Sequence, residues 1–500
     1  MRGGLFLRRV LQLRHGVFMC RILFLQYGPL LVSQLGVSSG LDRKPEDIFC
    51  TRILDKYLVY APRQHLSALL NRAAVLALAA GLRGEPPPSG ELAALVQALQ
   101  ADGNPHPALR TGPLEDPFFL GLIPTRGCNL NCPYCDFTAP KQASPQLSVE
   151  LARAAIDAYV RLLRLARKSR LEIHFFGGEP LYAWEAVFFA VEYARLQAVE
   201  QGLETRFEVI TNGMFDAGRA RWIADHFDTV VLSLDGFAEV QERQRPALNR
   251  RPTYPTILRN ARLLSEGPAE FALRACITQE NVGQMVEFAA WAARELRPGS
   301  LCFETLAESP RSRQAGLLPA DPFLFVQNFL AAKKILDSQG IETILSTDPP
   351  GSLQDSFCPL GKDALIVSPQ GSVDACYWLE EQWQHNGLDL HLGRVDEAGF
   401  VFESGALQRA REATLTNKDG CQDCLCQVHC AGGCHVRRGA APQGRHNAEV
   451  CFQTRAITVA RLLHELGQAD LAQAWLQDRL AVEAVVYTTS DRLVSLEGIQ

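Results

Sequence analysis

The sequence predicts an α/β protein built on a parallel sheet, either open or curled into a partial barrel of six β/α units. Six strand-like runs alternate with helical stretches between residues 113 and 345, an order typical of parallel sheets. After Pro349 the alternation stops and residues 350–455 are rich in loops. Eleven of the 15 cysteines fall in residues 128–135 and 358–451, which favours metal or cluster ligation over disulfides.

The overall composition indicates a folded protein of several units. A chain of 500 residues is too long for one ordinary core. Its 47% hydrophobic and 21% charged residues exclude an intrinsically disordered protein. The formal net charge of −5 and the lack of a basic block give no reason to expect binding to nucleic acid. We also expect no membrane partner and a cytoplasmic location.

Residues 1–46 are basic and apolar, so they faintly resemble a secretory signal. Basic side chains interrupt each apolar stretch before it is long enough for a signal core or a membrane span. These side chains are Arg8, Arg9, Arg14, His15 and Arg21. The sequence therefore predicts a leader that is disordered or partly helical.

Residues 47–112 predict a small α+β unit. A strand-like run at 51–61 precedes a helical run at 64–82, and a second helix at 91–103 follows the breaker "RGEPPPSG". Such a unit could hold a peptide by adding it as a strand to an exposed sheet edge. It could equally be an N-terminal cap, and the sequence leaves both interpretations open.

Residues 113–345 contain the predicted parallel sheet. Its six strand-like runs are "FFLGLIPT", "LEIHFFGG", "RFEVITNG", "TVVLSLDG", "EFALRACIT" and "SLCFETLAE". In such folds the chemistry gathers at the carboxyl ends of the strands. Unusual residues directly follow strands at Cys128, Gly177, Asn212, Asp235 and Thr278. The sequence therefore predicts a site at this edge of the sheet.

Residues 346–455 form a separate cysteine-rich segment with short hairpins, in which ligation would have to supply much of the order. Residues 456–500 follow as a C-terminal helix and tail, because residues from about 455 to 480 have the pattern of an amphipathic helix.

The first cysteine group, Cys128, Cys132 and Cys135, has the spacing C-x3-C-x2-C. A [4Fe–4S] cluster normally takes four thiolates, so three leave one iron open for another ligand. A structural zinc site would need a fourth Cys or His nearby, and residues 136–146 contain none. The spacing therefore favours a cluster with one open position.

This motif, with the aromatic Tyr134 before its last cysteine, resembles that of the radical S-adenosylmethionine (SAM) enzymes. The resemblance implies a partial (β/α)6 barrel core in which Cys128, Cys132 and Cys135 hold the catalytic cluster. In that family the amino and carboxylate groups of SAM bind the open iron. One electron from the cluster then cleaves SAM to methionine and a 5′-deoxyadenosyl radical.

The resemblance also implies a set of SAM contacts. "GGEP", at the end of the second strand, contains Gly177 and Gly178, which would let the backbone approach SAM, and Glu179, which would hold its ammonium. Other implied contacts are Ser233 and Asp235 near the ribose, Asn212 close by, and Arg274 on the SAM carboxylate. An Asp-Gly after a strand is also a common turn, and Arg274 could instead be a surface ion pair.

The second cysteine group resembles the SPASM extension of radical SAM enzymes, which carries two auxiliary [4Fe–4S] clusters. The resemblance implies one cluster on Cys421, Cys424, Cys430 and Cys451. It implies the other on Cys358, Cys376 and Cys434, one ligand short of a full set. The additional Cys426 could fill that gap or be a buried spare thiol. Zinc ribbons also use C-x2-C pairs, but the whole spacing favours clusters.

Members of this group modify peptides and proteins, so the resemblance implies hydrogen abstraction from a ribosomally made peptide or protein. The product would be a thioether, another crosslink or an oxidised residue, and a flavodoxin or ferredoxin would be the reductant. The alternative is formylglycine formation, as in anaerobic sulfatase maturases. There an Asp follows the cysteine equivalent to Cys376, whereas this chain has Tyr377, with Asp374 two residues earlier.

Two other functions are open to a chain with these motifs. A non-catalytic iron–sulfur electron carrier or binding protein would have no use for an open iron or for "GGEP". A radical SAM enzyme acting on a small molecule, such as a sugar, would carry the same motifs. The sequence does not identify the substrate or the bond formed.

Overall fold

The computed structural model describes residues 19–25, 28–34, 47–86, 90–104, 110–115, 117–135, 137, 144–348, 353–354, 356–414, 421, 423–438, 448–487 and 493. The rest of the predicted leader, residues 1–18, 26–27 and 35–46, lies outside this set. Within the leader, β1 (Met19–Leu25) and β2 (Gly28–Gln34) form an antiparallel pair. The expected disorder or helix is therefore wrong there, because runs rich in Ile, Leu and Val also suit a strand pair.

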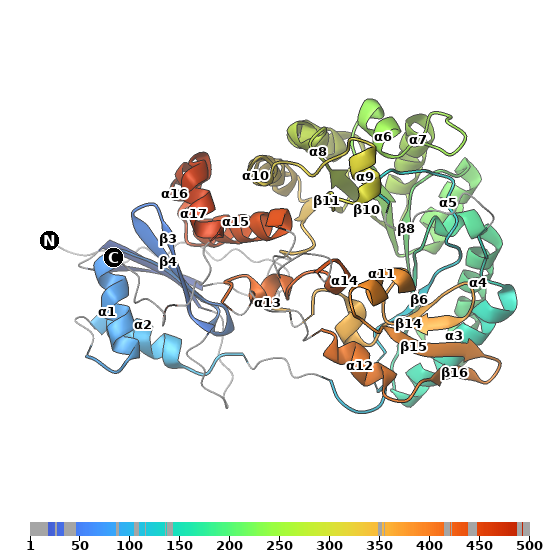
Figure 1. Cartoon of the computed structure of the whole chain (residues 1–500), viewed down its shortest axis with the longest axis horizontal. Helices are drawn as coiled ribbons and strands as arrows, with labels where there is room; N and C mark the ends of the chain where they lie inside the picture. The colour runs from blue at the N-terminus through green and yellow to red at the C-terminus, as the bar shows by residue number, and fades with distance from the viewer. Residues whose placement is uncertain are drawn as a thin grey trace.

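The predicted parallel sheet is confirmed. Its six strands are adjacent in chain order and parallel throughout, and a seventh short strand extends them on one side (Figure 1). The strands are β6 (Leu120–Leu122), β7 (Arg170–Phe175), β8 (Glu204–Thr211), β9 (Thr229–Ser233), β10 (Glu270–Ile277), β11 (Ser300–Thr305) and β12 (Glu342–Ile344). Sequential order in a parallel sheet is what repeated β/α units produce.

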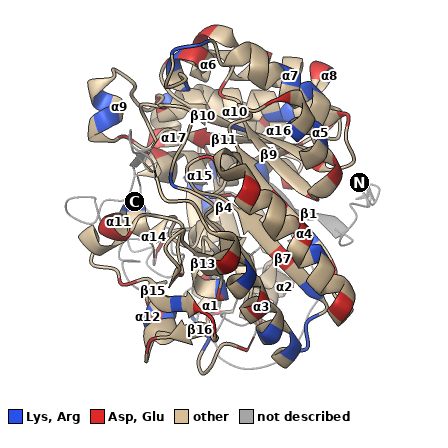
Figure 2. Cartoon of the chain, turned by 90° about the vertical axis from the view of Figure 1, so that its right-hand side faces the viewer, with Lys and Arg blue, Asp and Glu red and all other residues tan. Residues whose placement is uncertain are grey.

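Helices connect these strands. They are α3 (Val149–Leu165), α4 (Trp184–Gln201), α5 (Ala217–His226), α6 (Ala238–Gln244), α7 (Tyr254–Ser265), α8 (Met285–Glu295), α9 (Pro310–Gln314) and α10 (Pro322–Ser338). Short 3₁₀ turns stand at η3 (Pro180–Ala183) and η4 (Val282–Gln284). Figure 2 colours the charged residues on the ribbon, and both acidic and basic residues occur along the helices in view.

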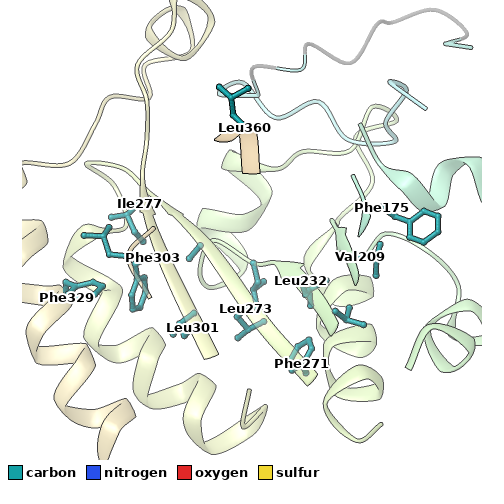
Figure 3. Close-up of a cluster of buried hydrophobic side chains, with 14 of the residues drawn as sticks. Phe175, Val209, Leu232, Phe271, Leu273, Ile277, Leu301, Phe303, Phe329 and Leu360 are labelled. Atoms are coloured by element: carbon teal, nitrogen blue, oxygen red, sulfur yellow. The ribbon is translucent and has the colours of Figure 1, made fainter. Parts of the chain in front are cut away.

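The core lies between the sheet and its helices. Leu273, Ala275 and Ile277 of β10 are fully buried, whereas the alternate residues Arg274 and Cys276 are only partly buried on the opposite face. Figure 3 shows the apolar face, to which β7 to β11 each contribute. Burying a Leu, Ile or Phe side chain contributes about 1.5–3 kcal/mol. The polar face is thereby left to line the interior of the partial barrel.

The cysteine-rich segment continues the same sheet. β13 (Leu365–Val367) pairs with β6 in parallel, and three antiparallel strands follow to complete an 11-stranded sheet. These strands are β14 (Ser372–Asp374), β15 (His391–Asp396) and β16 (Gly399–Phe402). The segment also has η5 (Pro359–Lys362), α11 (Glu380–His385), α12 (Ala406–Glu412), α13 (Gln427–Cys430) and α14 (His435–Arg438).

The N-terminal unit is a three-stranded antiparallel sheet with two helices. Its elements are β3 (Phe49–Ile53), β4 (Lys56–Ala61), η2 (Pro62–Gln64), β5 (Leu66–Leu70), α1 (Arg72–Leu82) and α2 (Gly90–Gln100). The single predicted strand is a hairpin, and the first half of the predicted helical run is β5. Pairing with β4 overrides the helical propensity of this Leu-rich run. The helix begins after Asn71, whose side chain accepts from Ala74 N at 2.9 Å.

The predicted C-terminal helix is three helices. These are α15 (Ala448–Glu465), α16 (Ala469–Gln477) and α17 (Arg479–Val486). Gly467, with φ of +72°, ends the first of them. α15 packs on α10, and α17 reaches β3 of the N-terminal unit (Figure 1). Of the helices described, none has the length and apolar character needed to cross a membrane.

Candidate active site

The loop that carries the first three cysteines follows β6 and is fixed by backbone hydrogen bonds on two sides. Asn131 N donates to Pro246 O at 2.8 Å, and Leu248 N donates to Asn129 O at 3.1 Å. On the other side, Glu179 N donates to Gly127 O at 2.9 Å. The loop is therefore held between the end of α6 and the turn after β7.

The three thiols of this loop converge. Cys128, Cys132 and Cys135 pack with Leu130 and Ala247 in one small apolar cluster, and their charges would act on one another. Burial raises the pKa of Cys128 to about 12 and also raises that of Cys132. Metal ligation replaces the thiol proton with a cation, which removes this cost. The donor set therefore fits an iron cluster.

Over the described part of the chain, no group of three His, Cys, Asp or Glu side chains is placed so as to hold a single metal ion.

Gly177 and Gly178 allow the turn after β7 to touch the cysteine loop. A Cβ on Gly178 would stand 2.2 Å from Gly127 O, and one on Gly177, with φ of +147°, would stand 2.6 Å from Thr125 O. Any side chain at Gly178 would displace the loop backbone. A side chain at either glycine would therefore meet the cysteine loop. This close contact explains why both positions are glycine, and it could not be predicted from the sequence.

Glu179 lies beneath the loop, with 1% of its surface exposed. Its carboxylate accepts from Thr211 Oγ1 at 2.7 Å, Asn212 N at 2.7 Å and Leu181 N at 3.1 Å. Burial raises its pKa to about 7, against the opposing effect of these three hydrogen bonds. A carboxylate has about four acceptor positions, so about one is left for a further donor. A bound ammonium group fits this position, because a cation would compensate the buried charge.

Asn212 follows β8 and joins that strand to the cysteine loop. Its Nδ2 donates to Asn129 Oδ1 at 2.8 Å and to Cys128 Sγ at 3.5 Å, and its Oδ1 accepts from Met214 N at 2.8 Å. The polar atoms of this side chain are thus engaged by the protein close to the thiols.

Asp235 follows β9 and is buried, and several protein groups contact its carboxylate. Its carboxylate accepts from Tyr134 Oη at 2.5 Å, Cys276 N at 2.9 Å and Gln244 Nε2 at 3.0 Å. Arg245 Nε forms an ion pair with it at 3.0 Å. The carboxylate thus has three hydrogen-bond donors, two on Oδ2 and one on Oδ1, with the Arg245 cation beside Oδ2. The ribose contact expected of Asp235 stays a prediction. No motif places Arg245 near Tyr134 or Asp235, so the sequence alone does not identify it.

Ser233 and Arg274 lie side by side in the interior of the barrel. They are register partners across β9 and β10, and Arg274 is in turn the partner of Cys302 on β11. Arg274 lies close enough to Glu304 and Cys302 for their charges to raise its pKa against the opposing effect of burial. Cys302 donates to Glu304 Oε1 at 3.2 Å. Arg274 is therefore an interior cation and not part of a surface ion pair.

The second cysteine group divides into two sets. Cys358, Cys376 and Cys434 act electrostatically on one another. The other set lines a cavity of about 190 Å³, on whose wall Cys434 also lies. Its cysteines are Cys421, Cys424, Cys426, Cys430 and Cys451. Glu304 and Thr305 at the end of β11 also line this cavity, so it opens toward the barrel interior.

Cys426 belongs to the set of cysteines that lines the cavity. It is 1% exposed, its Sγ lies 3.9 Å from Thr454 O, and it is hydrogen-bonded with Cys424. That bond and the nearby Arg455 lower the pKa of Cys424. The structure thus places Cys426 beside Cys424 and Cys430, whose charges act on it.

Tyr377 and Asp374 occupy different environments. The Tyr377 hydroxyl points into the barrel, 2.6 Å from where a Cβ on Gly121 would lie, so the phenol fills space that the glycine leaves. Asp374 accepts from His391 Nδ1 at 2.8 Å and from Ser372 Oγ at 3.0 Å. Asp374 is buried, so the alternative of a simple surface acid is wrong.

Comparisons with known proteins agree with this geometry. Residues 122–292 match the Radical SAM superfamily. Mycofactocin maturase MftC of Mycolicibacterium smegmatis is 26% identical over 332 residues, which are 61% of this chain and 80% of that protein. A serine-type anaerobic sulfatase-maturating enzyme of Klebsiella aerogenes is 27% identical over 350 residues, 66% of this chain and 82% of that protein.

The fold is also similar to a solved structure, native anSMEcpe with bound AdoMet. The two chains superpose with a TM-score of 0.56 at 17% identity, over 70% of this chain and 98% of the other. The thiol motif after the first strand, the "GGEP" turn that touches it and the sheet that supports both lie within the matched region. The chain therefore contains a Radical SAM domain over residues 122–292, and the relatives that match more of the chain are a maturase and a maturating enzyme.

Proposed function

We propose that this enzyme removes a hydrogen atom from a residue of a ribosomally made peptide or protein. The product is a thioether, another crosslink or an oxidised residue. The observation that carries the proposal is the gathering of two further cysteine sets, one of them on a cavity that Glu304 and Thr305 of β11 also line, in addition to the three thiols after β6. The names of the relatives, both maturases or maturating enzymes, support a peptide or protein substrate.

In this proposal Cys128, Cys132 and Cys135 hold the catalytic cluster. When bound, the cluster and SAM supply the one-electron chemistry that removes the hydrogen atom. Glu179 accepts an N–H from the SAM amino group through its remaining acceptor position, and Arg274 pairs with the SAM carboxylate. Ser233 lies beside Arg274 in register, which supports a role for its hydroxyl near the ribose.

Four further residues position this site in the proposal. Asn212 orients the loop through Asn129 and Cys128, and Asp235 orients Tyr134, because the polar atoms of both side chains already have protein partners. Gly177 and Gly178 bring the "GGEP" turn against the loop. In this proposal these positioning contacts add to the SAM contacts expected of Asn212, Asp235 and the two glycines.

The other cysteines are proposed to hold two auxiliary [4Fe–4S] clusters, making three in all. Cys421, Cys424, Cys430 and Cys451 hold one. Cys358, Cys376 and Cys434 hold the other, with one iron open. Cys426 is a spare thiol, because it lies close to Cys424 and Cys430 of the first auxiliary cluster. An external donor, a flavodoxin or ferredoxin, supplies the electrons.

Formylglycine formation is the second candidate, since a relative carries a sulfatase-maturating name. The base expected in that branch is replaced by Tyr377, whose phenol fills the barrel against Gly121. Asp374 is occupied by His391 and Ser372. Both observations favour a different outcome for the substrate radical. The non-catalytic alternative is not retained, because the chain belongs to an enzyme class.

The test is a turnover assay with anaerobically reconstituted enzyme, SAM and dithionite. The probes are a short cysteine-containing peptide and a sulfatase-derived peptide. We expect a peptide whose mass falls by two hydrogens and whose thiol no longer reacts with an alkylating agent. Formylglycine in the sulfatase peptide would instead support the second candidate. The Cys128/Cys132/Cys135→Ala variant is the matched control and should give neither product.

A further inference from the structure

Arg245 stands next to the cysteine loop without belonging to any motif. It follows α6 directly, and the next residues pair with the loop through Asn131 N to Pro246 O and an isolated bridge between Leu130 and Ala247. Its guanidinium carbon lies 5.5 Å from the centroid of the Tyr134 ring. The side chain is 13% exposed. Arg245 is therefore a largely buried cation held in a fixed place against the loop.

The charge of Arg245 acts on the thiol at the centre of the motif. Among charged groups that act on the Cys132 sulfur, Arg245 has the largest effect, and Asp235 opposes it more weakly. Glu179 contributes a negative charge on the other side, where it acts on Cys128. Charges in a buried site interact far more strongly than charges in water, because little solvent screens them.

We propose that Arg245 sets the reduction potential of the cluster held by Cys128, Cys132 and Cys135. The proposal rests on the assignment of that cluster in the proposed function. Reduction adds one electron, so the reduced site is more negative by one charge. A fixed cation beside Cys132 stabilises the reduced form and raises the potential, which makes the cluster easier to reduce. Net charge and solvent exposure are among the factors that set iron–sulfur potentials.

Asp235 moderates this effect. The carboxylate pairs with Arg245 at 3.0 Å and accepts from Tyr134 at 2.5 Å, so it fixes the cation while cancelling part of its field. The two residues should therefore shift the potential in opposite directions when each is neutralised. A merely structural role for the pair would not produce shifts of opposite sign.

The experiment is a redox titration of reconstituted holoenzyme followed by electron paramagnetic resonance. The signal to follow is the one that changes when SAM is added, because in the proposed function SAM binds the open iron of this cluster and not that of the cluster on Cys358, Cys376 and Cys434. The variants are Arg245→Gln, Arg245→Lys, Asp235→Asn and the double Arg245→Gln/Asp235→Asn. Arg245→Lys is the matched control, since it keeps the charge.

We expect Arg245→Gln to lower the reduced-to-oxidised ratio at a fixed potential by at least about tenfold, which is about 59 mV for one electron. Asp235→Asn should raise the ratio, Arg245→Lys should stay near the parent, and the double variant should lie between the two single changes. An unchanged ratio in Arg245→Gln with full iron content would overturn the inference. So would equal shifts in the Gln and Lys variants.

Two further results are decisive. If Arg245→Gln loads no cluster, the Asp235→Asn variant decides the test. A reduced-to-oxidised ratio that is unchanged or lowered in Asp235→Asn would overturn the inference. A parent enzyme without a SAM-sensitive signal would contradict the cluster assignment itself. That result would be distinct from failure of the role given to Arg245.

Discussion

The hydroxyl of Tyr60 lies 2.6 Å from Nε2 of His429, and the two rings stack at 5.9 Å with an angle of 14° between their planes. Tyr60 is on β4 of the N-terminal unit, and His429 is on α13 beside Cys430. The N-terminal unit therefore packs directly on the cysteine-rich segment. Burial raises the pKa of Tyr60, so the phenol stays protonated and able to donate.

Tyr60→Phe should reduce the stability of the protein. The change removes a buried hydrogen bond and leaves the Nε2 position of His429 without this donor, which costs about 1–3 kcal/mol. Thermal unfolding of the reconstituted enzyme measures the effect. Tyr57→Phe is the matched control, because Tyr57 is on the same strand, is also buried, and has no side-chain hydrogen bond among the described residues. Equal stability of the two variants would contradict the role given to the Tyr60 contact.

Iron content tests the number of clusters. We expect anaerobically reconstituted enzyme to carry about twelve irons in three [4Fe–4S] clusters. The Cys128/Cys132/Cys135→Ala variant should keep about eight and lose SAM cleavage, since the other two cysteine sets are separate in space. Zinc in place of iron, at one or two per chain, would be incompatible with the whole assignment.

Glu179→Gln should weaken SAM binding by about 1.5–3 kcal/mol, roughly ten- to hundredfold, by removing a charge-assisted contact. Gln is preferred over Ala because its amide oxygen can still accept from Thr211 Oγ1 and Leu181 N, so that of the protein contacts only the one with Asn212 N is lost. Calorimetry or equilibrium dialysis with SAM measures the loss. If the variant bound SAM as tightly as the parent, Glu179 would not be the ammonium partner.

The same residue predicts how SAM binding depends on pH. Burial raises the pKa of Glu179 to about 7 in the SAM-free site, so the carboxyl is protonated below that pH and ionised above it. An N–H donated by the SAM amino group favours the ionised form. Affinity for SAM should therefore rise as pH increases through about 7, and the rise should be smaller in Glu179→Gln. A parent enzyme with pH-independent affinity over this range would argue against the contact.

Much of the fold could be predicted from the sequence because its signals are local. Each parallel strand ends in a distinct motif, such as "FFGG" or "LSLDG", and each is followed by a helical pattern. The extension of the sheet by β13 could not be predicted, because pairing of Ile366 with Gly121 joins segments far apart in the chain. β5 was mistaken for helix for the same reason, since only its pairing with β4 makes it a strand.

The candidate site could likewise be predicted from the sequence only in part. Spacing predicted Cys128, Cys132 and Cys135, and the structure brings these thiols together. The hydrogen-bond partners of Asp235 could not be predicted, because Tyr134 and Cys276 come from distant strands and loops. A polar residue after a strand can bind a ligand or hold the site together, and only its neighbours in space decide between these roles.

The last prediction concerns the set of Cys358, Cys376 and Cys434. Because Cys426 lies with Cys424 and Cys430, we expect it not to complete this set, which leaves one iron open toward the substrate. A substrate thiolate is a natural soft ligand for that iron. Ligation would lower the pKa of the substrate thiol and orient its sulfur. Once the acceptor carbon has lost a hydrogen atom, the sulfur closes on it and one electron passes to the cluster.

Spectroscopy of the auxiliary clusters, with and without a thiol-bearing peptide, tests this arrangement. Cys426→Ala should keep both clusters and the full iron content, and the peptide should change the spectrum of parent and variant alike. A serine analogue of the peptide is the control and should change neither. Loss of a cluster in Cys426→Ala, with no response to the peptide, would falsify the open position. The cluster would then serve electron transfer only, and the product would be an oxidised residue or a carbon–carbon crosslink instead of a thioether.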